Sequence, residues 1–328
     1  MLFVENNNRD PYQNHALEEW LMDHVDQDCF MLWRNEKSIL LGKNQNAYSE
    51  INMPYAMEHG IKIVRRITGG GTVFTDEGNV MFTFISCNGR KDFSDFLMFT
   101  KPVLHALHRM GIPAEFSGRN DLTIDGKKFS GNAQCRYKDK LLHHGTLMYE
   151  ANTEELVKAL NVREIKLKSK GVSSVKSRVT NLSDYLTVKM DIEEFRRKMF
   201  YMVMEETPGA ELFRLTQNQW QEVRQRALKG HATKEWIYGS NPSFDIRRET
   251  KLTGGIVEVF LNIEKGKISE ARIYGDFFGD GDIHEVERHL SGVLYEKEAI
   301  RNALAEFAAG TYFGAIRNDE LTTAFISI

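Results

Sequence analysis

The stretch at residues 65–79 constrains this chain more than any other, because three consecutive glycines lie between two arginines and an apolar run. The glycines at 69–71 have no Cβ, so a bound group can lie against the backbone and the amides can point at its oxygens. Arg65 and Arg66 suit a phosphate or a carboxylate. Turn chemistry allows a plainer interpretation, a glycine-rich hairpin with solvated arginines. The segment therefore predicts an anion-binding loop or a tight hairpin, followed by a buried strand at residues 80–85.

The composition is that of an ordinary globular chain with room for two domains. It has 328 residues, of which 41% are hydrophobic and 27% are charged. The net charge of -3 argues against a general nucleic-acid binder, which needs a basic field. Three widely spaced cysteines indicate neither a disulfide framework nor a CxxC metal site. With a polar start and no bilayer-length apolar run, we expect a cytoplasmic protein with no nucleic-acid or membrane partner.

Helix and strand patterns alternate irregularly. Apolar residues at helical spacing predict a first helix that Asn14 caps, with Glu18, Glu19 and Asp23 on its other face. Strands are expected at residues 29–33, 38–42, 61–64, 80–85 and 143–149, a helix at about 93–110 that ends at Gly111, and a hairpin at Asp125-Gly126. Because no regular βαβ alternation occurs, a mixed-sheet α/β or α+β domain is favoured over a doubly wound one.

A polar, breaker-rich stretch at residues 240–254 marks a candidate domain boundary. Beyond it, alternation at 257–263 predicts a strand, Lys265-Gly266 a turn and residues 268–273 a second strand. Two helices are expected at about 283–294 and 296–309. The end of the chain is therefore predicted to be a small α+β unit.

Lys128 is the second candidate for binding an anion. It follows the predicted hairpin and precedes Ser130 and Gly131, so its ammonium has small neighbours and can be aimed at a carboxylate or an α-phosphate. Exposed lysines after a turn are also common. Asp121, ahead of the hairpin, is either a Mg²⁺ ligand or a turn residue.

Two further features stay open from their residues alone. His143 and His144 are adjacent on a predicted strand and so point to opposite faces, which excludes joint chelation of a metal. Five cations occur between Lys166 and Arg178 without an acid, which fits a loop folded over phosphates or a solvated loop. The P-loop, GxSxG and dinucleotide fingerprints are absent.

Taken together and in order, these segments resemble the lipoate–protein ligase family over nearly the whole chain. The matching motifs are Arg65-Arg66, Thr68 to Gly71, Asp76 to Asn79, Gly118 to Leu122, Lys128 with Ser130, Gly131 and Ala133, His143 to Leu147, and Gly171 to Leu182. Residues 41–46, the opening helix and the segment that begins at Gly254-Gly255 are similar as well. The resemblance implies an α+β, mixed-sheet catalytic domain of the biotin/lipoyl-ligase type at residues 1–246. A small C-terminal α+β accessory domain would then follow at 247–328.

The resemblance also implies the activity. A ligase of this family uses MgATP to convert free lipoate into lipoyl-AMP and pyrophosphate. It then transfers the lipoyl group to a lysine of a carrier domain, either the glycine-cleavage H protein or an E2 subunit of a 2-oxoacid dehydrogenase. We accordingly expect a monomer with ATP and Mg²⁺ as cofactors, acting in lipoate salvage.

The implied site residues fall into four groups. Lys128 is the catalytic residue and holds the lipoate carboxylate and the α-phosphate together. Contacts to ATP or the adenylate are expected from Arg66, Gly71, Thr72, Val73, Phe74, Asn79, Lys128, Ser177 and Arg178. Contacts to lipoate are expected from Arg65, Thr68, Gly69, Gly70, Thr75, Lys128, Ala133, Arg136, His144 and Gly145, and Asp121 is the candidate Mg²⁺ ligand.

One position departs from the family pattern, since Thr75 stands where members usually carry histidine. An ATP-independent octanoyl or lipoyl transferase of the same superfamily remains an alternative. It would need a reactive thiol, for which Cys135 is the one to test. A biotin ligase and a non-catalytic lipoate-binding protein are further alternatives.

Overall fold

The computed structural model describes residues 1–87, 95–118, 120–161, 178–239 and 245–326. It divides into two compact units. The larger unit comprises Met1–Leu40, Ile51–Arg65 and Val73–Ile237, and the smaller one comprises Leu41–Glu50, Arg66–Thr72 and Tyr238–Ile328. The glycine-rich segment thus groups with the C-terminal part of the chain. Within the described ranges, no helix is long and apolar enough to cross a membrane.

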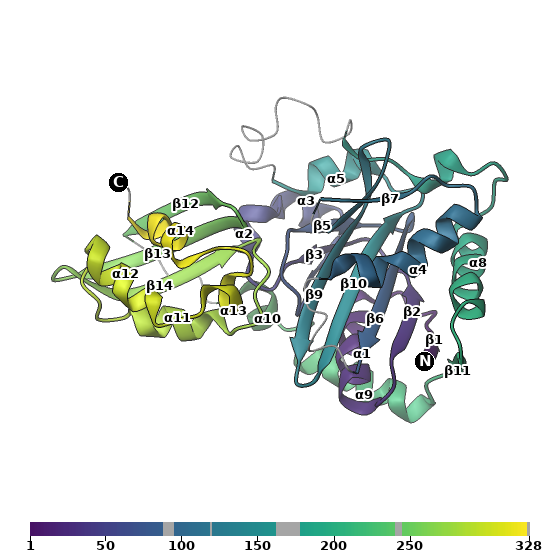
Figure 1. Cartoon of the computed structure of the whole chain (residues 1–328), viewed down its shortest axis with the longest axis horizontal. Coiled ribbons are helices and arrows are strands. Elements are labelled where there is room, and N and C mark those ends of the chain that lie inside the picture. The colour runs from purple at the N-terminus through teal and green to yellow at the C-terminus, as the bar shows by residue number, and fades with distance from the viewer. Residues whose placement is uncertain (88–94, 119, 162–177, 240–244, 327–328) are drawn as a thin grey trace. The chain divides into compact units, whose positions relative to one another are not determined.

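An eight-stranded mixed sheet forms the centre of the larger unit (Figure 1). Its strands, in spatial order, are β11 (Glu211–Phe213), β1 (Leu2–Glu5), β2 (Cys29–Trp33), β6 (Asn79–Ser86), β10 (Lys140–Met148), β9 (Lys127–Tyr137), β8 (Asp121–Ile124) and β7 (Glu115–Ser117). The pairs β11–β1 and β1–β2 are parallel, and the pairs that follow are antiparallel. The predicted mixed sheet is confirmed.

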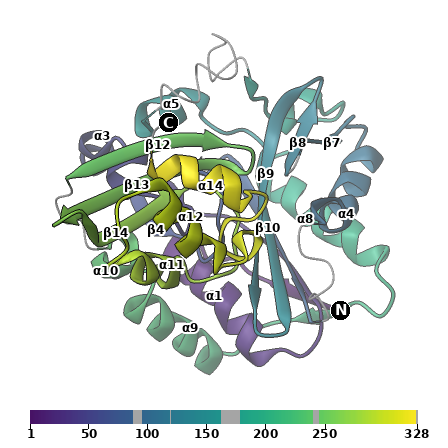
Figure 2. The same cartoon turned by 60° about the vertical axis from the view of Figure 1, so that its left-hand side comes forward.

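Helices cover both faces of this sheet (Figure 2). They are α1 (Pro11–His24) and α9 (Gln217–Lys229) on one face, and α4 (Phe96–Arg109) and α8 (Ile192–Glu205) on the other. Alternation along β6 explains this division, because Thr83 bonds to α1 whereas Phe84 packs against Phe99 of α4. Helices α8 and α9 were not predicted from the sequence.

Shorter elements complete the larger unit. A three-stranded sheet has the order β4 (Lys62–Arg65), β3 (Ser38–Leu41) and β5 (Val73–Thr75), which leads into and out of the glycine-rich segment. The remaining elements are α3 (Met53–Glu58), α5 (Thr153–Ala159), the 3₁₀ helix at Leu182–Tyr185 and α10 (Lys234–Tyr238), while α2 (Ala47–Glu50) belongs to the smaller unit.

The first helix begins earlier than its sequence predicts. Asp10 is the cap and accepts from the Gln13 amide at 3.0 Å, while Pro11 occupies the first turn, where proline is well tolerated. Asn14 is inside the helix and buried, and its amide donates to Arg34 O at 2.9 Å. The predicted cap was therefore wrong, because Asn14 serves tertiary contacts instead.

The C-terminal part of the smaller unit is the predicted α+β fold, with additions. Its antiparallel sheet is β12 (Ile246–Leu252), β13 (Gly255–Glu264) and β14 (Lys267–Gly275), and its helices are α11 (Ile283–Leu290), α12 (Lys297–Ala305), α13 (Ala309–Phe313) and α14 (Asn318–Phe325). Lys265 and Gly266 have φ values of 50° and 73°, as a tight hairpin requires. Strand β12 and helices α13 and α14 lie outside what the sequence predicted.

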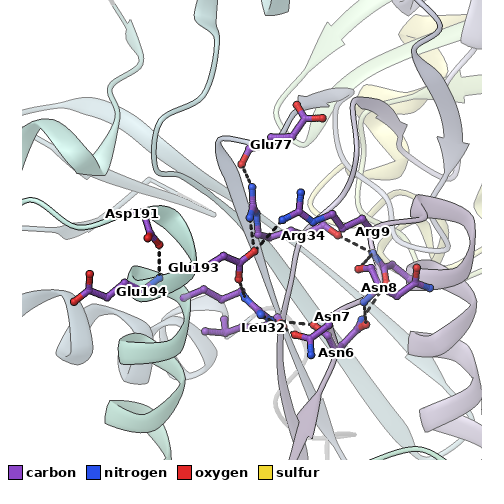
Figure 3. A network of polar contacts seen from close by, with 12 residues as sticks. Asn6, Asn7, Asn8, Arg9, Leu32, Arg34, Glu77, Asp191, Glu193 and Glu194 are labelled. Carbon is purple, nitrogen blue, oxygen red and sulfur yellow. Dashed lines mark hydrogen bonds and ion pairs between the residues drawn. The ribbon is translucent and has the colours of Figure 1, made fainter.

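A carboxylate ties α8 to the residues that follow strands β1 and β2 of the main sheet (Figure 3). Glu193 accepts hydrogen bonds from Arg9 at 3.0 Å, from Arg196 at 2.9 Å and from the buried Arg34. Arg34 also donates to Glu77 O. Burial opposes ionisation of Glu193, but Arg196 and Arg34 outweigh it and hold its pKa below the ordinary value. The contact fixes the first turn of α8 beside the residues that follow β1.

We expect Glu193→Gln to lower the free energy of unfolding by about 1–3 kcal/mol, because it removes the carboxylate that pairs with the buried Arg34. Glu194→Gln is the matched control, since that neighbouring side chain is exposed. Urea unfolding curves measure both variants, and equal midpoints for the two would contradict the assignment.

Candidate active site

The glycine loop, which we define as Arg66–Thr72, closes around the guanidinium of its own Arg66. Arg66 is nearly fully buried and donates to the carbonyl oxygens of Gly69 and Gly71, both at 3.0 Å, and to the Thr68 hydroxyl at 3.2 Å. In a trans peptide the N–H points opposite to the C=O, so the amide after each carbonyl is directed away from the arginine. The loop thus offers backbone donors on its outer side, as an anion-binding loop does.

Segment Leu41–Glu50 supports the loop within the smaller unit. A Cβ on Gly42 would lie 1.9 Å from the carbonyl oxygen of Gly70, so only glycine fits there. Gln45 Oε1 accepts from the Gly42 amide at 3.0 Å and from the Thr72 hydroxyl at 2.8 Å. The similarity of residues 41–46 to the family pattern therefore has a physical reason, because this segment braces the loop.

Lys128 lies near the start of β9 with its ammonium 2.6 Å from Asp121 Oδ1. A Cβ on Gly131 would come within 3.0 Å of Lys128 Nζ, so this glycine gives the lysine side chain room. The backbone of Lys128 pairs with that of Val179, so the segment that contains Arg178 and Val179 runs alongside β9 at this point. An ion pair this exposed is worth about 0–1 kcal/mol, so an anionic substrate can replace Asp121 as the partner of Lys128.

A buried carboxylate that sequence analysis missed lies between α1 and the main sheet. Glu18 Oε1 accepts from Thr83 Oγ1 at 2.7 Å and is 2.9 Å from His144 Nδ1, while Oε2 is 2.9 Å from His15 Nδ1. Trp33 in turn donates to Thr83 Oγ1 at 2.8 Å. Both imidazoles therefore donate from Nδ1, which fixes the ring orientation and tautomer of His144.

The sequence places Glu18 on the polar face of the first helix, opposite the apolar residues, yet its side chain is 0% exposed. Its three-residue spacing from His15 on one helix was the available signal. The predicted opposite orientation of the two adjacent histidines is confirmed, since His143 stacks on Phe99 at 5.1 Å while His144 faces α1. In the described residues, His15, Glu18 and His144 also form the one cluster close enough to hold a metal, but hydrogen bonds account fully for their spacing.

Because of this cluster, we expect the stability of the fold to decrease at acidic pH. Burial lowers the pKa of His15 from 6.5 to about 4. The unfolded chain therefore takes up the proton first, and stability present above pH 6.5 is lost as the pH falls toward 4, by on the order of 3 kcal/mol. We expect His15→Leu to flatten this slope in urea unfolding measured from pH 7 to pH 5. A slope equal to that of the parent chain would exclude His15 as its source.

Two predicted lipoate contacts have protein partners. The Arg65 guanidinium donates to Trp236 O at 3.0 Å and Ile237 O at 2.6 Å, which ties β4 to the last turn of α10, where a cation is favoured. Thr75 is fully buried with its hydroxyl 3.0 Å from that of Ser38 on β3. In this structure both residues hold elements of the larger unit together.

The other predicted lipoate contacts lie on β9 and β10. Ala133 and His144 are register partners and so share the α1 face of the sheet. Gly145 pairs with Asn132, and a Cβ there would lie 2.2 Å from Asn132 Oδ1, so packing demands glycine. Arg136 is exposed near the end of β9.

The remaining adenylate candidates flank the glycine loop in sequence. Val73 is half-buried and Phe74 is buried on β5. Asn79 accepts from the Asp76 amide at 3.0 Å and closes the turn before β6. Ser177 lies outside the described residues.

The cysteines bear on the thioester alternative. Burial raises the pKa of Cys29 to about 12 and also raises the pKa of Cys87. Cys135 is buried on β9. Because a thiolate is the nucleophile, raised pKa values disfavour Cys29 and Cys87 as acyl carriers.

Comparison with protein families agrees with this geometry. Residues 10–202 match the model of the lipoyl protein ligase A/B catalytic domain, and residues 241–325 match that of the bacterial lipoate protein ligase C-terminus. The chain is 40% identical over 325 residues to lipoate-protein ligase LplJ of Bacillus subtilis, and 39% identical over 324 residues to lipoate–protein ligase 1 of Staphylococcus aureus. Each alignment covers 98% of both proteins.

Solved structures show the same fold. LipL1 of P. falciparum, determined in complex with lipoate, superposes with a TM-score of 0.75 at 28% identity and covers 94% of each chain. A lipoate-protein ligase A bound with ATP superposes with a TM-score of 0.63 at 23% identity, over 72% of this chain and 98% of the other. The expected α+β ligase fold is confirmed.

Proposed function

This chain belongs to the lipoate–protein ligase family, and on that premise we propose that it is an ATP-dependent ligase that acts through lipoyl-AMP. In the first step a lipoate carboxylate oxygen attacks the α-phosphorus of ATP, and pyrophosphate leaves. In the second, the amine of a carrier lysine attacks the carbonyl carbon, AMP leaves, and the nitrogen loses a proton as the amide forms. Neither step needs a nucleophile from the enzyme.

The glycine loop is the observation that carries this proposal. Arg66 holds two carbonyls inward, so that amides face outward, and a Cβ on Gly71 would meet nothing within 4 Å. A phosphate can therefore approach the bare backbone at this point. We assign the adenylate to Arg66, Gly71, Thr72, Val73, Phe74, Asn79, Lys128, Ser177 and Arg178.

Lys128 has the catalytic role in this proposal. Its half-exposed ammonium is free to bridge the lipoate carboxylate and the α-phosphate, two anions that otherwise repel each other. The same charge stabilises both transition states. The Asp121 carboxylate beside it is an oxygen ligand of the kind Mg²⁺ prefers, and the bound ion would neutralise phosphate charge.

We assign the lipoyl group to Arg65, Thr68, Gly69, Gly70, Thr75, Lys128, Ala133, Arg136, His144 and Gly145. Ala133 and His144 support this assignment most directly, because they share one face of the sheet. A bipartite lipoate protein ligase of the same fold from Thermoplasma acidophilum has an E2 lipoyl domain as its counterpart, which supports carrier domains as acceptors. We further propose that the protein is a cytoplasmic monomer in lipoate salvage, with the H protein or an E2 subunit as its carrier.

A single assay tests the proposal. Purified protein is incubated with lipoate and a panel of apo-carriers, with and without ATP, and mass spectrometry detects the lipoyl adduct. We expect the mass increase only with ATP present. Transfer from an acylated carrier without ATP would instead identify the alternative transferase.

A further inference from the structure

The glycine loop is backed by a segment of the C-terminal part of the same unit. A Cβ on Gly69 would lie 2.6 Å from the carbonyl oxygen of Phe277, and one on Gly70 would lie 2.9 Å from the ring of Phe278. Gly70 also has φ of +90°, which other residues rarely adopt. Two of the three glycines are thus required by residues more than half the chain away.

That backing segment is itself rigidly held. Phe277 is 0% exposed and its ring lies 5.0 Å from that of Phe313 in the C-terminal core. A Cβ on Gly314 would lie 2.2 Å from Phe278 O, so helix α13 ends directly against the segment. The Gly275 amide donates to Asn44 O at 2.7 Å, which joins the end of β14 to the segment beneath the loop.

The conformation of the loop is therefore restricted on two sides. On its inner side, Arg66 donates to the carbonyl oxygens of Gly69 and Gly71. On the other side, Phe277 and Phe278 pack against Gly69 and Gly70, and of the three glycines Gly71 alone has open space at its Cβ. Three successive glycines are costly to order, because each loses more conformational freedom than any other residue. A ligand that binds the loop amides therefore binds more tightly when the protein already holds the loop in one conformation, because the loss of conformational entropy then does not reduce the binding free energy.

We propose that Phe277 and Phe278 are positioning residues for the glycine loop, so that the C-terminal part of the chain sets the affinity for the nucleotide. The inference rests on the proposed function, since that function assigns both the adenylate and the lipoyl group to residues of this loop. We assign neither aromatic residue a contact with the reacting atoms. Their effect is to hold the loop amides in the geometry that an α-phosphate requires.

Phe278→Ala tests the inference in the lipoylation assay. We expect KM for ATP to rise about tenfold, which corresponds to about 1.4 kcal/mol of lost binding energy. KM for lipoate should rise as well, because Gly69 and Gly70 are assigned to the lipoyl group, whereas kcat should change less than twofold. Phe278→Leu, which keeps an apolar side chain against Gly70, should restore most of the ATP affinity. Phe307→Ala is the matched control, because that ring packs on His289 and Tyr312 and should leave both KM values unchanged.

A second pair of variants keeps the test decisive if Phe278→Ala folds poorly. Gly69→Ala forces a methyl group onto Phe277 O and should also raise KM for ATP, whereas Gly310→Ala, with open space at its Cβ and no positive φ, should not. Unchanged KM for ATP in folded Phe278→Ala and Gly69→Ala, or a fall in kcat without a rise in KM, would overturn the inference. A parent chain without ATP-dependent lipoylation would overturn the proposed function instead, so the two failures are distinguishable.

Discussion

Lys128→Ala is expected to abolish lipoate-dependent ATP–pyrophosphate exchange while leaving the protein folded. The proposed reaction brings a carboxylate onto a phosphate, and the lysine supplies the positive charge that offsets their repulsion. Preorganised charge in a site from which water is excluded commonly contributes about 3 kcal/mol or more, which corresponds to about a hundredfold or greater loss of rate. The fold should persist, because the ion pair with Asp121 is half exposed and contributes little stability.

The adjacent Lys127 provides the control. It is exposed and belongs to the same strand, so Lys127→Ala removes an equal charge from the same hairpin without touching the proposed site. We expect exchange in Lys127→Ala to stay within about twofold of the parent chain, since surface substitutions change energies little. Full exchange in Lys128→Ala, or equal losses in both variants, would remove Lys128 from its catalytic role.

Local patterns predicted most of the framework correctly. The strand expected at residues 29–33 is β2, because five successive apolar residues buried on both faces read as a central strand. Asp125 and Gly126 have φ values of 51° and 74°, the left-handed pair that this dipeptide favours in a hairpin. Such elements depend on the chain within a few residues, which a sequence displays directly.

Contacts between distant segments were not predictable in the same way. Glu18 reads as an exposed acid on a helix, and only the docking of α1 on the sheet shows that Thr83 and His144 bury it. Gly69 and Gly70 read as ligand-contacting residues, whereas the structure adds a requirement from the segment after β14. Spacing identifies a motif, but it does not show which side of the motif other parts of the protein already occupy.

Glu18→Ala is expected to lower the free energy of unfolding by about 3–5 kcal/mol, as the loss of one partner from a buried polar cluster commonly does. The carboxylate is 0% exposed, and its removal leaves the Nδ1 donors of His15 and His144 without an acceptor. Burial alone would raise the pKa of Glu18, but its interactions with His144 and His15 outweigh burial and hold that pKa below the ordinary value, so the carboxylate is ionised at neutral pH. Urea unfolding at pH 7 measures the loss.

Glu19→Ala is the matched control, because it removes the same group one residue away. Glu19 is partly exposed, and its carboxylate lies 3.5 Å from Arg226 and 3.0 Å from Nε2 of the buried His231. Its loss should therefore cost about 1 kcal/mol, well below the cost at Glu18. Glu18→Gln separates charge from shape, since its amide keeps one acceptor but turns a donor toward an imidazole N–H. A cost near that of Glu18→Ala would mean that the charge holds the cluster, whereas a cost near that of Glu19→Ala would mean that the two histidines change tautomer and keep His144 in place without it.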